Sequence, residues 1–136
     1  MPRPYSRIAR EIVPGWEISL AFVSPKTAQA LNKRLRGKSY TPNVLAYPVG
    51  TKHGEVIICK QIARHEAPAF GLSYADFTLL LFIHALLHLK GLSHGTTMEK
   101  RERALLARFT RAGRTYGSSH HYRDRHRHLP SKGRRR

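Results

Sequence analysis

The sequence predicts a small α+β domain, in which a mixed β-sheet is covered by helices, followed by a disordered basic tail. Two observations support this fold class. Helix-like and strand-like patterns alternate over residues 1–110 in the order α, β, α, β, β, α, α, α. The one cysteine, Cys59, excludes an internal disulfide, so a chain of 136 residues is expected to rely on an apolar core.

The first elements are identified by alternation and by capping residues. Residues 7–13 predict a short helix, and residues 16–23 predict a strand because apolar and more polar side chains alternate there. Ser24 and Pro25 fit the N-cap and first position of the next helix, and Gly37 fits its end. The face of this helix expected to pack on the sheet carries Ala28, Leu31, Asn32 and Leu35.

Two short β-rich runs, 44–47 and 55–59, predict the other strands, with Pro48 in the loop between them. A helical turn or two over residues 61–67 is expected to follow. The three strands predicted in this half of the domain are enough for one small sheet.

The longest apolar stretch predicts a central, buried helix. Ser73 and Asp76 resemble the ends of a capping box, and the helix they open is expected to run to about Lys90, before Gly91. The stretch is shorter than the roughly 20 apolar residues of a spanning helix, so we expect no membrane segment. A second capping box over 96–99 is expected to open a last helix, with Leu105, Leu106 and Phe109 facing the core.

The formal net charge of +17 indicates a polyanionic partner, which favours nucleic acid. Residues 1–110 hold 16 Lys/Arg and 7 acids, and residues 111–136 hold 9 Lys/Arg and one acid. Because the second segment is almost free of aliphatic residues, we predict a disordered tail. Clustered positive charge opposes metal binding at its histidines, which are His120, His121, His126 and His128. Without a signal-peptide pattern, a cytoplasmic location is expected.

Three histidines form the strongest chemical signal in the sequence. His84 and His88 are four residues apart and share one face of the central helix. Gly91 allows a turn that brings His94 back toward them. Three imidazoles with a fourth position open suit a catalytic Zn²⁺ ion. The spacing also matches a zinc-peptidase pattern, but Ala85 stands where those enzymes carry their catalytic glutamate.

Three segments in order carry a family resemblance. They read HALLHLKGLSH (84–94), LNKRLRGKSYTPNVLAYP (31–48) and GEVIIC (54–59). Together they resemble the signature motifs of the YbeY-type endoribonuclease family, the metal-dependent nucleases of ribosomal RNA maturation. The resemblance covers about residues 17–109, and departs from the motifs at Ala85 and Ser93 among other positions.

The resemblance implies a function and a site. We expect a zinc-dependent, single-strand-specific endoribonuclease that matures the 3′ end of 16S ribosomal RNA and takes part in ribosome quality control. It implies one Zn²⁺ per chain on the three histidines, with His84 and Arg36 as catalytic residues and ribosomal small-subunit proteins as candidate partners. A guanidinium suits phosphate binding. The cations around Arg36 predict an RNA-facing wall, made of Lys33, Arg34 and Lys38.

Two alternatives and several weaker candidates accompany this interpretation. The chain can also be a non-catalytic RNA- or ribosome-binding protein with a structural metal, or, less favourably, a degenerate zinc peptidase. The oligomeric state and the general base stay open. Cys59 and Trp16 are expected to pack in the core, and His53 and His65 to lie on the surface. Asn43 is expected to order its loop.

Overall fold

A computed structural model describes residues 1–111 of the chain. The predicted tail, apart from its first residue, and its four histidines lie outside this part. In chain order the described elements are α1 (Arg3–Ile12), β1 (Glu17–Val23), α2 (Pro25–Arg36), β2 (Val44–Gly50), β3 (His53–Cys59), α3 (Lys60–Glu66), the 3-10 helix η1 (Ala67–Phe70), α4 (Tyr74–Lys90) and α5 (Thr96–Phe109).

The sheet is mixed, as predicted. Its strand order is β1-β3-β2, with β3 parallel to β1 and antiparallel to β2. The prediction of a loop at Pro48 is wrong, because β2 continues through Pro48 to Gly50 with an irregularity between them. As an edge strand, β2 has one side without a neighbouring strand, and this is where a sheet tolerates proline.

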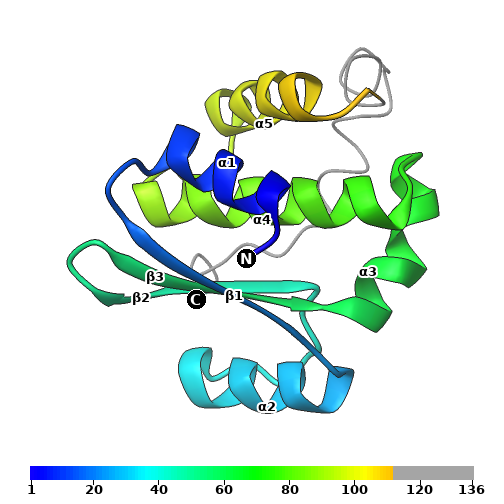
Figure 1. Cartoon of the computed structure of the whole chain (residues 1–136). Helices are drawn as coiled ribbons and strands as arrows, with labels where there is room; N and C mark the ends of the chain where they lie inside the picture. Colours follow the sequence, from blue (N-terminus) through cyan, green and yellow to red (C-terminus); the bar gives the residue numbers. More distant parts are fainter. Residues whose placement is uncertain (112–136) are drawn as a thin grey trace.

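The helices form layers on both faces of the sheet (Figure 1). Helix α2 covers one face, and α4 crosses the other face, where it packs on β2 and β3. Helices α1 and α5 pack against α4 on its side away from the sheet. The fold is therefore the predicted α+β class, with α4 between the sheet and α5.

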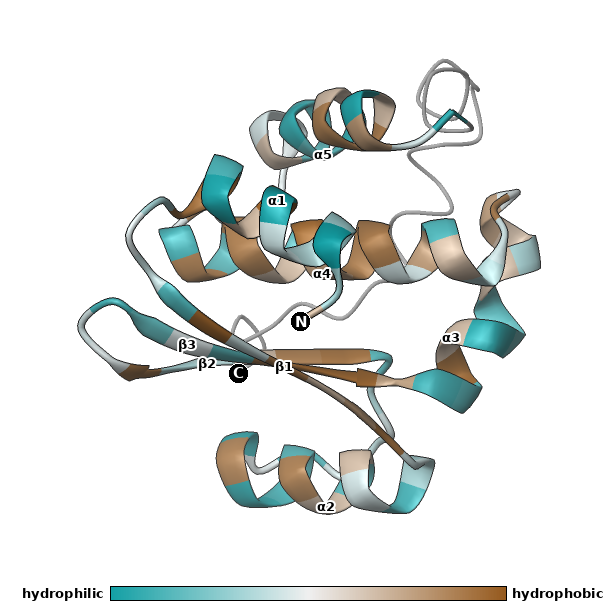
Figure 2. Ribbon diagram, viewed as in Figure 1, coloured by the Kyte–Doolittle hydropathy of each residue, from teal (hydrophilic) through white to brown (hydrophobic). Residues whose placement is uncertain are grey.

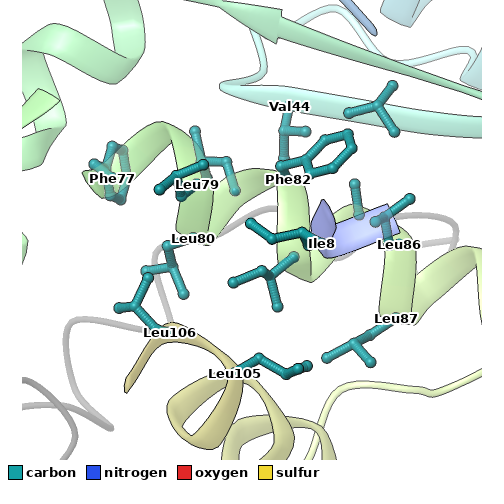
Figure 3. Packing of buried hydrophobic residues seen from close by; sticks show 14 of the residues in the cluster. Ile8, Val44, Phe77, Leu79, Leu80, Phe82, Leu86, Leu87, Leu105 and Leu106 are labelled. Atoms are coloured by element: carbon teal, nitrogen blue, oxygen red, sulfur yellow. The ribbon is translucent and has the colours of Figure 1, made fainter. Parts of the chain in front are cut away.

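Helix α4 is the centre of the core. The Oγ of Ser73 accepts a hydrogen bond from the N–H of Asp76 at 3.1 Å, so the predicted N-cap is confirmed, and every residue over 77–87 is buried. The apolar colour of α4 runs along its length in Figure 2. Figure 3 shows its leucines facing those of α5, with Leu80 and Leu87 on one side and Leu105 and Leu106 on the other.

Membrane-spanning length is not reached by any single helix among residues 1–111. The segments Lys60–Phe70 and Tyr74–Lys90 reach it only as a pair, bent by 102° at the break between them. Most of α4 is buried inside the protein, as in the core helix of a globular fold.

Three other expectations need correction. Helix α1 starts at Arg3 rather than residue 7, since a proline fits the first turn of a helix. Helix α5 starts at Thr96, behind a Gly95 N-cap that offers no side-chain hydrogen bond, so the second capping box is not formed. On α2, Ala28 and Asn32 are buried but Leu35 is 42% exposed. A sheet of three strands is too narrow to cover the whole predicted face of α2.

Candidate active site

Two of the three candidate histidines lie one turn apart on α4. His84 is completely buried and His88 is partly buried, near the C-terminal end of the helix. The ring nitrogens Nε2 of His84 and Nδ1 of His88 are both shielded from solvent. The helical spacing therefore places two imidazoles on one buried side of α4, as predicted.

The third histidine, His94, lies in the short connection between α4 and α5. Gly91 ends α4 with φ 114°, and Gly95 precedes α5 with φ 149°. Both values lie where a side chain is strained, so glycine is favoured at the two bends of this connection. The ring centroid of His94 is 5.0 Å from that of His84, with an angle of 61° between the rings. The turn thus brings His94 back to His84, as the sequence predicts.

A carboxylate that the sequence analysis did not select completes this cluster. Glu102, on α5, is hydrogen-bonded through Oε2 to Nδ1 of His84, and both side chains are fully buried. On α5 it occupies the core-facing stripe together with Met98, Leu105 and Leu106. A glutamate at a position where the helical period demands an apolar residue is the signal that identifies it.

The donor set fits a divalent metal ion in its chemistry. Imidazole nitrogens are ordinary zinc ligands, and a histidine ligand usually donates its other ring N–H to a carboxylate, as His84 can to Glu102. Throughout the described residues, no three His, Cys, Asp or Glu side chains are arranged to hold a metal ion together. Binding at all three histidines therefore requires side-chain movement from the positions seen here.

Arg36 ends α2, and its side chain stays close to its own helix. Its Nη1 donates hydrogen bonds to Oδ1 of Asn32 at 3.3 Å and to the hydroxyl of Tyr40 at 3.1 Å. Its Nε and Nη2 are buried and have no hydrogen-bond partner within residues 1–111. A buried donor without a partner costs about 1–3 kcal/mol, which an anion at this fork would recover.

Arg36 and the candidate histidines come from different helices. Arg36 lies on the last turn of α2, His84 and His88 lie on α4, and Figure 1 shows these two helices on opposite faces of the sheet. The hydrogen bonds of Arg36 go to Asn32 and Tyr40. Helices α2 and α4 both end near the end of the sheet at which β2 turns into β3 (Figure 1).

The other cations of the predicted RNA-facing wall lie next to Arg36 in sequence, at the C-terminal end of α2. Lys33 and Arg34 are exposed on the last turn of α2, and the partly buried Lys38 follows it. Arg34 is close enough to lower the pKa of Tyr47, but burial and a hydrogen bond to Glu55 outweigh it and raise that pKa to about 12. Tyr47 and Glu55 face each other across β2 and β3.

The weaker candidates mostly hold structural positions. Cys59 is buried and Trp16 packs against the core, as predicted, while His65 is exposed on α3. The Nδ2 of Asn43 donates to Oε1 of Glu66 at 2.9 Å, which ties the loop before β2 to α3.

Comparison with known proteins links the chain to one family. The family model described as Endoribonuclease YbeY matches residues 5–110. A protein of this name from Thiobacillus denitrificans is 36% identical over 103 residues, which cover 68% of this chain and 70% of the relative. One from Helicobacter pylori is 38% identical over 92 residues, covering 65% and 66%, and one from Campylobacter jejuni is 34% identical over 101 residues, covering 68% and 75%.

A solved structure shows the same fold. The solution structure of TM1509 from Thermotoga maritima superimposes with a TM-score of 0.60 over 85% of this chain and 83% of that one, at 21% sequence identity. At this identity the likeness concerns the fold alone. It supports the arrangement of helices on a three-stranded sheet described above.

Proposed function

Because this chain belongs to the Endoribonuclease YbeY family, we propose that it is a metal-dependent endoribonuclease that cuts single-stranded RNA. The observation that carries the proposal within the structure is that the fully buried His84 is hydrogen-bonded to the buried Glu102 and lies beside the ring of His94. A buried imidazole with one nitrogen held by a carboxylate and a second imidazole beside it is the arrangement found around metal ligands.

Zn²⁺ is the ion that we propose for this site, one per chain, with His84, His88 and His94 as its ligands. Neutral imidazoles on a helix turn and a following loop suit zinc better than magnesium, which prefers oxygen ligands. When bound, zinc supplies Lewis acidity toward the phosphodiester and lowers the pKa of bound water. Glu102 holds the ring of His84, and the buried surroundings of α4 keep bulk water away from it.

Arg36 is proposed to bind a phosphate of the RNA. Its two buried donors without a partner form a fork that matches two phosphate oxygens. Lys33, Arg34 and Lys38 then supply non-specific attraction to the RNA backbone.

Ribosomal RNA is the substrate we propose, with maturation of the 3′ end of 16S ribosomal RNA and ribosome quality control as the processes served. Ribosomal small-subunit proteins are proposed partners, and the cytoplasm is the proposed location. The support for these finer points is the sequence resemblance to the family and the net charge of +17, which favours a polyanion.

A second function is favoured by one observation. Among residues 1–111 no three potential ligands are arranged around a metal ion. A protein that binds ribosomal RNA without cutting it, with any metal in a structural role, would have no need of a catalytic metal site.

RNA cleavage before and after metal removal separates the two functions. The purified chain is incubated with an end-labelled single-stranded RNA and with the same strand in a duplex. The nuclease cuts the single strand, stops after chelation and recovers with added Zn²⁺. An RNA-binding protein retains the labelled strand in a mobility shift but leaves it intact under every condition, and this result would exclude the nuclease.

A further inference from the structure

The pair of His84 and Glu102 is a fully buried polar contact between two helices. Both side chains are completely shielded, and the carboxylate reaches His84 from a different helix, 18 residues later in the sequence. Burying a carboxylate is costly unless it is hydrogen-bonded. An apolar residue at position 102 would fit the stripe of Met98, Leu105 and Leu106 without this cost. The pair therefore calls for a functional explanation.

The contact decides which nitrogen of His84 carries the proton. A carboxylate oxygen accepts hydrogen bonds, so Nδ1 donates its N–H to Oε2 of Glu102. In the neutral ring, Nε2 then carries the lone pair, and Nε2 is the atom that remains for a metal ion. Without an acceptor beside Nδ1, the ring is free to adopt the other tautomer, in which Nε2 is protonated and unable to bind metal.

The surrounding packing holds the carboxylate in place. On α5, Leu105 and Leu106 lie one turn beyond Glu102 and face Leu80 and Leu87 of α4 (Figure 3). These leucine contacts pack α5 against α4 and so support the approach of the carboxylate to the ring. His94 lies against the same ring, with 5.0 Å between the centroids.

From these contacts we propose that Glu102 is a positioning residue, which sets the tautomer and the direction of the His84 ring so that Nε2 is presented to the metal ion. This inference rests on the proposed metal site, but it concerns a residue outside the three histidines. A hydrogen bond of this kind typically changes metal affinity by about 10–100-fold.

The first experiment needs neither metal nor RNA. In the metal-free full chain labelled with ¹⁵N, the ring nitrogen shifts of His84 distinguish the two tautomers, and His84→Ala assigns the signals. We expect the proton on Nδ1 in the parent protein. A parent whose His84 carries its proton on Nε2 would overturn the inference, even if that protein cuts RNA.

The second experiment measures zinc affinity in competition with a chromogenic chelator. Glu102→Gln keeps the size of the side chain and an oxygen that can accept, whereas Glu102→Leu removes the acceptor and suits the apolar stripe. We expect weaker zinc binding by about 10–100-fold in Glu102→Leu, a smaller loss in Glu102→Gln, and a shift of the His84 ring toward the other tautomer in both. Glu17→Gln, an exposed carboxylate on β1, is the matched control and keeps the parent values.

Unchanged zinc affinity in Glu102→Leu would overturn the proposal, and so would weaker affinity with an unchanged tautomer, since that result describes a purely structural residue. A parent that binds Zn²⁺ through His84 but leaves RNA intact would instead contradict the proposed nuclease. The two proposals therefore fail in different measurements.

Discussion

Single polar groups inside the protein determine what its candidate site can do. The carboxylate of Glu102 and the ring of His84 are buried together, and two donors of the Arg36 guanidinium are buried with no partner in the described residues. A hydrogen-bonded carboxylate such as Glu102 orients a histidine ligand, whereas the buried donors of Arg36 that have no partner create an affinity for an anion. The carboxylate and the guanidinium therefore have different roles in the proposed reaction.

Replacing Arg36 tests its role in binding phosphate. We expect Arg36→Ala to lower the cleavage rate of single-stranded RNA by about 10²–10³-fold, because the variant has no charged donor for the RNA phosphate. Arg36→Lys recovers only part of the rate, since an ammonium cannot form the two-pronged contact. The rates are measured under single-turnover conditions.

The matched control for Arg36 is Lys26→Ala. Lys26 is an exposed cation on the first turn of the same helix, so this substitution removes the same charge far from the fork. A fall in rate that is equal in both variants would show that Arg36 contributes only general positive charge.

The pH dependence of Tyr47 tests the environment of the edge strand. Burial and the Glu55 hydrogen bond raise the pKa of Tyr47 to about 12, so the fold favours the protonated phenol. The stabilisation that this raised pKa gives the folded protein is complete below pH 10, the ordinary pKa of a tyrosine. It is lost as the pH rises toward 12. We expect a tyrosinate absorbance step near pH 12 that is missing in Tyr47→Phe and moves to lower pH in Glu55→Gln. An unchanged step in Glu55→Gln, compared with the surface variant Glu11→Gln, would contradict this assignment.

At the residue level, helical spacing and the glycine after α4 revealed the three histidines but not the carboxylate partner of His84. His84 and His88 are recognisable because a helix places residues four apart on one side. The partner of His84 comes from another helix, and only the packing of α4 on α5 brings Glu102 to it. Sequence spacing carries no information about such a contact between helices.

At the level of elements, the connection from α4 to α5 positions the third candidate histidine. It turns at Gly91 and Gly95 and places His94 against His84. Both backbone conformations are unfavourable for any residue with a Cβ, although nothing lies within 4 Å of a Cβ built at either glycine. The strain of a substitution would therefore be conformational rather than steric.

An alanine at position 91 tests this connection. We expect Gly91→Ala to destabilise the protein by about 1–2 kcal/mol, measured by denaturant unfolding, and to weaken zinc binding because His94 is displaced. Gly15→Ala provides the control, since Gly15 has φ 83°, has open space around it and precedes β1 far from the histidines. If both variants lose stability and both keep the parent zinc affinity, His94 is not a ligand.

Elements with strong end signals were predicted well. The Ser24 and Ser73 caps and the glycines after α2 and α4 mark their helices correctly. The wrong predictions concern residues whose structure or burial depends on neighbouring elements rather than on local sequence. Pro48 is accepted because β2 is an edge strand, and Leu35 is exposed because the sheet is narrow. Neither property can be inferred from local propensity.

Over the whole molecule, the cationic end of α2 and the histidine-bearing α4 belong to opposite faces of the sheet. Lys33, Arg34 and Arg36 lie on the last turn of α2, and Figure 1 shows α2 on one face of the sheet and α4 on the other. The two helices are about 50 residues apart in sequence, and neither sequence segment encodes which face of the sheet its helix covers.

Deleting residues 111–136 tests the basic tail predicted from composition. This segment carries 9 Lys/Arg against one acid, so its removal should weaken RNA binding and reduce its salt dependence. For each phosphate that the shortened chain no longer neutralises, the slope of log K against log salt falls by roughly 0.7 for single strands. A tail of equal length with serine in place of Lys and Arg should behave like the deletion. The same slope in all three proteins would show that the tail does not bind RNA.

The central claim is that the histidine cluster is the centre of an RNA-cutting site. The most direct test compares single-turnover cleavage of a single-stranded RNA, in the presence of Zn²⁺, by the parent, His88→Ala and His65→Ala. His65 is an exposed histidine on α3, outside the cluster. We predict that His88→Ala loses at least about 10²-fold in rate while His65→Ala cuts like the parent. Equal cleavage by all three proteins would contradict the account.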